Sequence, residues 1–336
     1  MRVLMGFQIL AMWNKLGDSK VHFLPEMVGP FLEVTLVPET ELRKATLPIF
    51  FDMMDTEQRF HNNFKQVESE LIYKLDILVS ENKGDDEYRQ LFNTILLDRV
   101  KSNDPVWKEN GIAFINSITR LLERLLDYRN VLEGVENRDK RMSCTVNLLS
   151  FYRNEINRKE MYIRYIYKLC DLHLPAENYT EAAFTLKLHS DLLSWSDNVL
   201  RADEHYREQP EWQRREALYL RIIGYFDKGK CWEKGIPLCK ELAELYEKKV
   251  FNYEKLSSIL KTQAQFFDNI LNQLRPEPEY FRVGFYGIGF PLFLRVSTEL
   301  DFSAIFLFTD FCGANILHLI SFCNAEQSVC VQRPRI

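Results

Sequence analysis

The segment GYFDKGKC at residues 224–231 has the spacing of a phosphate-binding loop, with two glycines five positions apart and a lysine after the second. Such a loop holds phosphates with backbone N–H groups and the lysine, and binds Mg²⁺ through a serine or threonine hydroxyl. Cys231 stands in place of that hydroxyl, and a thiol is a poor ligand for a hard cation. The preceding residues, REALYLRIIGYF, have helical periodicity where a phosphate-binding loop needs a strand. We therefore expect a helix that ends at Gly229 in a left-handed cap, with the next helix starting at Cys231.

Other residue types that catalyse reactions or bind metals are scattered. Gly284, Gly287 and Gly289 lack dinucleotide-binding spacing and precede no helical pattern, so we expect turns or bulges there. The six histidines are isolated, and His173 and His189 fit ordinary core or surface positions. No nucleophile elbow, H-E-x-x-H motif or zinc-spaced cysteine pair occurs. The sequence predicts no catalytic residue, no metal and no cofactor.

The charge of the chain argues against nucleic acid as a ligand. Its 336 residues carry a formal net charge of −5, and no long basic stripe is present. Seven cysteines without pairing motifs indicate reduced thiols and a cytoplasmic protein. In the opening stretch, Leu4, Phe7, Leu10 and Trp13 recur at helical spacing. An amphipathic helix fits this stretch better than a signal peptide, because Gln8 interrupts the apolar run and no cleavage site follows.

Helical periodicity continues from residue 4 to about residue 275, which predicts an all-α array whose helices cover one another's apolar faces. Two apolar stripes carry this prediction most clearly: Val67, Leu71, Leu75 and Leu78, and Ile115, Ile118, Leu121, Leu122 and Leu125. Later helices are expected at about 140–155, 157–174, 179–196, 210–228, 231–248 and 253–274.

A weak internal repeat relates residues 177–193 to residues 229–245. Tyr179 corresponds to Trp232, and Ala182 corresponds to Gly235 one helical turn later. Small residues at that point allow a neighbouring helix to approach closely. The pattern is typical of tetratricopeptide-like hairpins, although two degenerate copies are few.

The composition changes after residue 276, where RPEPEYF breaks the helical pattern and YFRVGFYGIGF predicts strand and turn. Beyond residue 295 charge almost vanishes. Residues 302–323 have the length of a membrane span but contain Asp310, Asn315 and His318, which are costly in a single span. We expect residues 296–336 to be a poorly ordered hydrophobic tail, with a membrane anchor or a novel module as the alternative.

Seven stretches of the chain carry a family resemblance: VGPFLEVTLVPETELRKATLPIFFDMM, NNFKQVESELIYKLD, LLERLLDYRNV, RMSCTVNLLSFYRNEINRKEMYIRYIYKLCDLHL, ENYTEAAFTLKLHSDLLSWSD, YFDKGKCWEKGIPLCKELAELYE and LRPEPEYFRVGFYGIGFPLFLR. Together they resemble the dedicator-of-cytokinesis family of guanine nucleotide exchange factors. The likeness is nearly continuous from residue 4 to residue 295. It is strongest to the subfamily that acts on Rac and, in some members, on Rap.

The resemblance implies a domain map. Residues 1–107 would be the end of an armadillo-like helical region, and residues 108–275 would be lobe A of the DOCKER catalytic domain, which mediates homodimerisation. Residues 276–295 would be the first strands of the β-containing lobe B, followed by the tail at 296–336. On this map most of lobe B and all of lobe C, which carries the nucleotide-sensing loop, are absent.

The resemblance also implies a function. The chain would be a cytoplasmic fragment of an exchange factor for Rac-like or Rap-like small GTPases, recruited to membranes by others and itself inactive in exchange. The rival hypothesis is a helical interaction module that pairs with full-length protein as a dominant negative or scaffold. For that role we single out the helix at 210–228, with Trp212, Leu220 and Ile223 as the partner surface.

Overall fold

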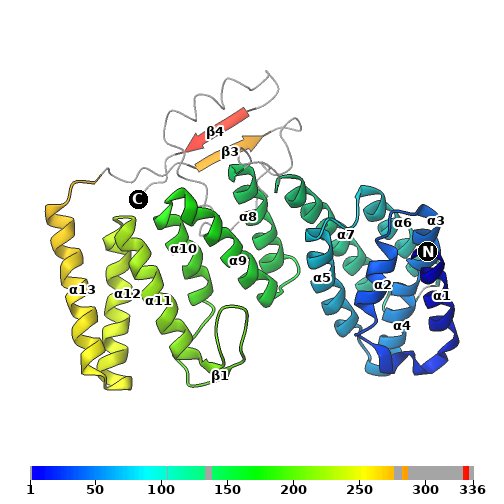
Figure 1. Ribbon diagram of the computed structural model, residues 1–336, viewed down its shortest axis with the longest axis horizontal. Coiled ribbons are helices and arrows are strands. Elements are labelled where there is room, and N and C mark those ends of the chain that lie inside the picture. The colour runs from blue at the N-terminus through cyan, green and yellow to red at the C-terminus, as the bar shows by residue number, and fades with distance from the viewer. Residues whose placement is uncertain (1, 104, 133–137, 276–281, 287–327, 333–336) are drawn as a thin grey trace. The chain divides into compact units, whose positions relative to one another are not determined.

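The computed structural model describes residues 2–103, 105–132, 138–275, 282–286 and 328–332 (Figure 1). These residues are helical apart from two short antiparallel strand pairs, so the all-α prediction is confirmed. The chain divides into two compact units, residues 1–157 and 158–336, and each is described by itself. The sequence-based boundary at 107/108 falls between two helices of the first unit.

Unit 1 is a helical array in which neighbouring helices bury apolar stripes. Its elements are α1 (Arg2–Lys15), the 3₁₀ turn η1 (Gly17–Phe23), α2 (Val28–Thr35), α3 (Thr40–Thr46), α4 (Ile49–His61), α5 (Lys65–Ser80), α6 (Asp86–Asn103), α7 (Lys108–Asn130) and α8 (Arg138–Asn154). Both predicted stripes, on α5 and α7, are buried. The prediction for the first helix was only partly right. Trp13 is buried and donates a hydrogen bond to Asp52 (2.7 Å), whereas Leu4 and Phe7 are exposed.

A buried arginine joins α3 to the start of α6. The Arg43 side chain is fully buried, and its guanidinium donates to both carboxylate oxygens of Asp85 at 2.8 Å and to Glu87 at 3.0 Å. It also donates to the Val37 carbonyl at 2.9 Å. Partial burial opposes ionisation of Asp85, but the hydrogen bonds from Arg43 and from the Tyr88 backbone N–H outweigh it and lower the pKa of Asp85. A buried guanidinium is tolerated here because all of these acceptors surround it.

Unit 2 contains five long helices that stand side by side in chain order (Figure 1). Its helical elements are α9 (Lys159–His173), the 3₁₀ turn η3 (Leu174–Ala176), α10 (Tyr179–Ser190), α11 (Glu211–Lys228), α12 (Trp232–Leu245), the π-helical turn η4 (Tyr246–Val250) and α13 (Tyr253–Asn272). The repeat found in the sequence corresponds to α10 and α12. Tyr179 and Trp232 are the first residues of these helices, and Ala182 and Gly235 both face neighbouring helices in the core.

The strands are short. β1 (Val199–Leu200) pairs with β2 (Gln209–Pro210) within the connection between α10 and α11, where the sequence predicted a helix to residue 196. β3 (Arg282–Tyr286) is a strand, as predicted, and pairs with β4 (Ser328–Gln332), with Gly284 opposite Cys330. β4 was not predicted, and it lies within the expected hydrophobic tail at residues 296–336. The stretch considered as a membrane span, 302–323, lies outside the described residues.

Gly235 sets the distance between α12 and α13, which suggests a test by substitution. A Cβ atom at Gly235 would lie 2.6 Å from the Phe266 ring, whereas one at Gly224 on α11 would meet nothing within 4 Å. Gly235→Ala should destabilise the protein by roughly 1–2 kcal/mol, because the clash exceeds the gain in helix propensity. Gly224→Ala, as the matched control, should stabilise it by about 0.5–1 kcal/mol. Urea unfolding followed by circular dichroism measures both, and a stabilising Gly235→Ala would contradict the close packing.

Candidate functional site

The segment with phosphate-loop spacing is a turn between two helices. α11 continues to Lys228, and α12 begins at Trp232, so no strand precedes the glycines. The left-handed residue is Lys230 (φ 54°), not Gly229 (φ −78°), which corrects the sequence-based expectation. Gly229 is required for a different reason. A Cβ atom there would lie 2.4 Å from the Thr180 hydroxyl at the start of α10.

The three residues predicted as a partner surface on α11 differ in how far they are exposed. Ile223 is buried in the core of unit 2, Trp212 is half-buried, and Leu220 is exposed to 47% of its surface. Helical periodicity could not separate these positions, because α11 is covered by α10 on one side and by α12 on the other. Leu220 is thus the one member of the trio that is open to a partner in this structure.

A more extensive apolar surface lies on α13, which ends the helical row of unit 2 in Figure 1. Only Ile259 and Phe266 of this helix are buried. A second face of the helix lies about 100° around the axis from the buried one and carries exposed apolar side chains. Tyr253, Leu260 and Phe267 recur on it every seven residues, and Leu271 is 82% exposed. Ser257 and Ala264 complete the series, giving the alternating spacing of three and four residues of a helix–helix seam. We call these six residues, Tyr253, Ser257, Leu260, Ala264, Phe267 and Leu271, the α13 seam.

The α13 seam has a groove and flanking charges. A shallow depression of about 440 Å³ is lined by six residues: Tyr253, Leu256, Ser257, Leu260, Lys261 and Ala264. Lys261 and Asp268 follow Leu260 and Phe267 directly, so they lie on the same flank of the seam, one heptad apart. The sequence analysis assigned α13 to the array but missed this seam. Its heptad pattern alone does not show which of two apolar faces the array leaves uncovered.

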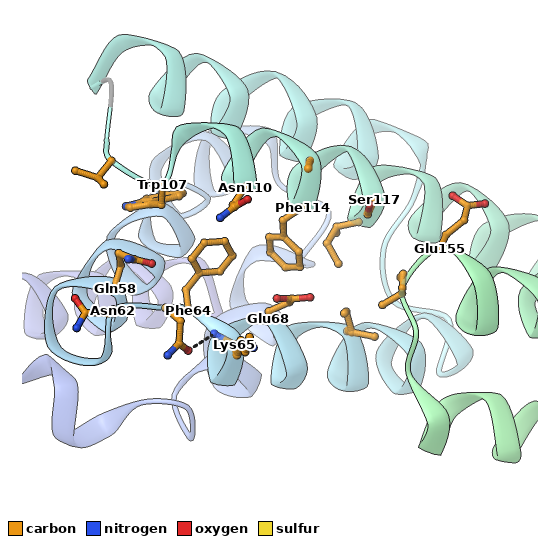
Figure 2. A pocket seen from close by; sticks show the side chains of 16 residues that line it. Gln58, Asn62, Phe64, Lys65, Glu68, Trp107, Asn110, Phe114, Ser117 and Glu155 are labelled. Carbon is orange, nitrogen blue, oxygen red and sulfur yellow. Dashed lines mark hydrogen bonds between the residues drawn. The ribbon is translucent and has the colours of Figure 1, made fainter. Parts of the chain in front are cut away.

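A second groove, of about 540 Å³, lies in unit 1 (Figure 2). It runs between α5 and α7 and is closed at one end by Gln58 and Asn62 of α4. Its floor is aromatic, with Phe64 between Trp107 and Phe114 at centroid distances of 5.4 and 5.9 Å. These rings are almost fully buried and extend the core of unit 1 to the surface.

Burial determines the protonation of three cysteine thiols among the described residues. Burial raises the pKa of the Cys144 and Cys170 thiols to about 12 and that of Cys239 to about 11, which disfavours the reactive thiolate. Among the residues that the structure describes, no group of three His, Cys, Asp or Glu side chains is arranged to hold a metal ion. None of the helices it describes is both long and apolar enough to cross a membrane.

The described residues form a helical array with one uncovered apolar seam, and comparison with known proteins identifies its family. The model of the dedicator of cytokinesis (DOCK) TPR region matches residues 1–95, and the model of DHR-2, lobe A, matches residues 194–272. The chain belongs to the dedicator-of-cytokinesis family. The sequence analysis expected armadillo-like helices where the matched model describes a TPR region, and both are arrays of stacked helix pairs.

Similar proteins include human dedicator of cytokinesis protein 3, which is 57% identical over 304 residues, and human dedicator of cytokinesis protein 4, which is 55% identical over 295 residues. Each match covers 88% of this chain and 15% of the relative. DOCK-like protein 1 of Saccharomyces cerevisiae is 28% identical over 179 residues, which cover half of this chain and 9% of the yeast protein. The chain therefore spans about 15% of the length of the human relatives.

Proposed function

We propose that this chain is part of a guanine nucleotide exchange factor for Rac-type small GTPases, in which it supplies the helical support of the catalytic region. The match of residues 194–272 to lobe A of DHR-2 carries the proposal, since these residues form α11, α12 and α13. Exchange factors act by binding the nucleotide-free GTPase more tightly than the loaded one, and they form no covalent bond with it.

In this proposal the chain is cytoplasmic, reaches membranes by recruitment and contributes no nucleotide-displacing contact itself. The DOCKER lobe map and the choice of Rac over Rap belong to the same proposal. We propose that lobes B and C of the full-length protein contact the GTPase, and that the α9–α13 row supports these lobes mechanically. The described helices then serve to hold other lobes in place.

Release of a fluorescent GDP analogue from purified Rac tests this division. We expect the release rate with the chain in tenfold excess to equal that of the GTPase alone, because the nucleotide-displacing contacts lie elsewhere. Chelation of Mg²⁺ with EDTA provides the positive control for release. A tenfold or greater acceleration by the chain would show that lobe A contacts the nucleotide site, and the proposed division would be abandoned.

A second candidate function is self-association, which the α13 seam favours. An exposed heptad face on a terminal helix is the surface from which helix–helix interfaces are built. A chain that pairs with a full-length copy through this seam would act as a scaffold or as a dominant negative. The seam replaces the α11 trio as the location of this function, since Ile223 is buried.

A further inference from the structure

The connection between α10 and α11 is long for a helical array. It runs from Asp191 to Pro210, and the β1–β2 pair closes a loop at residues 201–208. Most connections in compact domains are about 4–6 residues long, and longer ordered ones are frequently functional. This one is held firmly at its base, where the Glu211 carboxylate accepts hydrogen bonds from Ser194 and Ser196.

The loop itself is held by one buried cation. The Arg214 side chain is only 6% exposed and donates to the Asp203 carboxylate at 2.7 Å. Its other terminal nitrogen donates to the carbonyls of Arg201 (2.8 Å) and Arg207 (3.3 Å). The guanidinium also lies 5.3 Å from the centre of the Tyr206 ring. The closed shape of the loop thus depends on Arg214 and on what packs against it.

Tyr206 connects the loop to the core of unit 2. Its hydroxyl shares a hydrogen bond with that of Tyr167, which lies 3.1 Å from His189 Nδ1. His205, the preceding loop residue, stacks on the Tyr167 ring at 3.6 Å. Burial raises the pKa of Tyr167 and lowers that of His189, so the surroundings of these hydroxyls disfavour charge. Tyr206 as a whole is half-buried.

We propose that Tyr206 is a site of phosphorylation by a protein tyrosine kinase, and that its modification opens the 201–208 loop. Asp203 and Glu204 stand three and two residues before it, and acidic residues there suit a kinase whose substrate groove is basic. In the transfer, the Tyr206 oxygen bonds to the γ-phosphorus of Mg-ATP. The bond from that phosphorus to the β,γ-bridging oxygen breaks, ADP leaves, and the hydroxyl proton passes to the base of the kinase.

The modified side chain cannot keep its place. A phosphate carries a charge of about −1.5 to −2 near neutral pH. Beside the Tyr167 hydroxyl this charge would be desolvated, and the Asp203 carboxylate would repel it on the loop side. The ring must therefore leave the Tyr167–His189 contact. Arg214 then loses its aromatic neighbour, and the backbone at Arg201 and Arg207 becomes open to proteases.

The test treats the full chain with Mg-ATP and a recombinant tyrosine kinase that prefers acidic substrates, and maps the modified sites by mass spectrometry. We expect phosphate on Tyr206, and loss of most of the label in Tyr206→Phe. Tyr253, which is 67% exposed and follows no acidic pair, provides the matched control, so Tyr253→Phe should leave the label unchanged. A peptide of residues 198–211 should be labelled at the same tyrosine.

Brief trypsin treatment reports loop opening. Cleavage after Arg201 and Arg207 should become about tenfold faster in the phosphorylated chain, because Arg214 no longer holds the carbonyls of these two residues in the closed loop. Tyr206→Phe keeps the ring beneath Arg214 and should be cleaved at the unmodified rate after kinase treatment. Label on Tyr253 with Tyr206 unmodified would overturn the site, as would failure of the peptide to react. Phosphorylated Tyr206 with unchanged cleavage would overturn the opening.

Discussion

Replacement of Leu260 by arginine is expected to abolish self-association of the chain at micromolar concentration. Leu260 lies near the middle of the α13 seam and is 47% exposed. If two copies of α13 pack antiparallel with Leu260 level with Leu271 of the second copy, Phe267 falls against Ala264 of that copy. The seam is then filled by large residues opposite small or complementary ones. An arginine at position 260 would bury one positive charge from each copy, two per dimer.

Sedimentation velocity at several concentrations measures the effect. A loss of roughly 3 kcal/mol corresponds to a dimer about 100-fold weaker. Leu220→Arg on α11 is the matched control, because Leu220 is also 47% exposed but lies off the seam. We expect that variant to self-associate like the unmodified chain. If Leu220→Arg alone dissociates the dimer, the interface lies on α11 instead. If the unmodified chain is monomeric at every concentration, the α13 seam is not a self-association surface.

The flanking charges provide a stricter check of the antiparallel arrangement. In that register Lys261 of one copy lies beside Asp268 of the other, twice per dimer. Lys261→Glu should weaken the pair, Asp268→Lys should do the same, and the double variant should recover most of the loss. Flanking ion pairs set orientation and partner choice more than total stability. Each single substitution should therefore raise the dissociation constant of the dimer by about a few-fold to tenfold. Additive weakening in the double variant would rule out this register.

Helical periodicity predicted the array well because it reports which residues of a helix are apolar. The stripes on α5 and α7 are buried as expected, and the small residues Ala182 and Gly235 lie at close helix contacts. The failures share one cause. Periodicity does not say how many neighbours a helix has, so it neither separates the buried Ile223 from the exposed Leu220 on α11 nor reveals the exposed seam of α13.

The sequence predicted turns and helix ends correctly where the local backbone determines them. It predicted them less well where contacts with distant residues determine them. The turn at residues 229–231 was predicted, but its left-handed residue is Lys230, since Thr180 and not a left-handed cap requires glycine at 229. The helix predicted to residue 196 ends at Ser190. Trp195 continues the apolar pattern, yet its ring packs on Tyr219 and beside the Arg215 guanidinium of α11.

Mild acid is expected to destabilise unit 2 through two buried histidines. His173 and His189 are each 1% exposed, and burial lowers the pKa of both to about 4. Neither ring nitrogen of His173 has a hydrogen-bond partner among the residues that the structure describes. His189 is near Asp203, Arg214, Lys159 and His205, whose opposing charges leave burial as the dominant cause.

The direction of the change in stability with pH follows from the protons that the folded and unfolded chains bind. Below about pH 6.5 the unfolded chain binds a proton at each histidine, whereas the folded chain does not until about pH 4. Stability is therefore complete above pH 7 and is lost as the pH falls from about 6.5 to 4. At pH 5 each histidine should remove roughly 2 kcal/mol from the free energy of unfolding. Hydrogen exchange in α9 and α10 should show this loss first, since both histidines lie in these helices.

His173→Met separates this effect from general acid sensitivity. Methionine fills a similar volume without a group that must stay neutral, so the variant should gain roughly 2 kcal/mol over the unmodified chain at pH 5 and much less at pH 7.5. His22→Gln is the control, because His22 is exposed and its change should alter neither value. Urea unfolding at the two pH values, followed by circular dichroism, measures the difference. Equal pH dependence in His173→Met and the unmodified chain would mean that His173 gains a proton in the folded state, which its apolar surroundings should prevent.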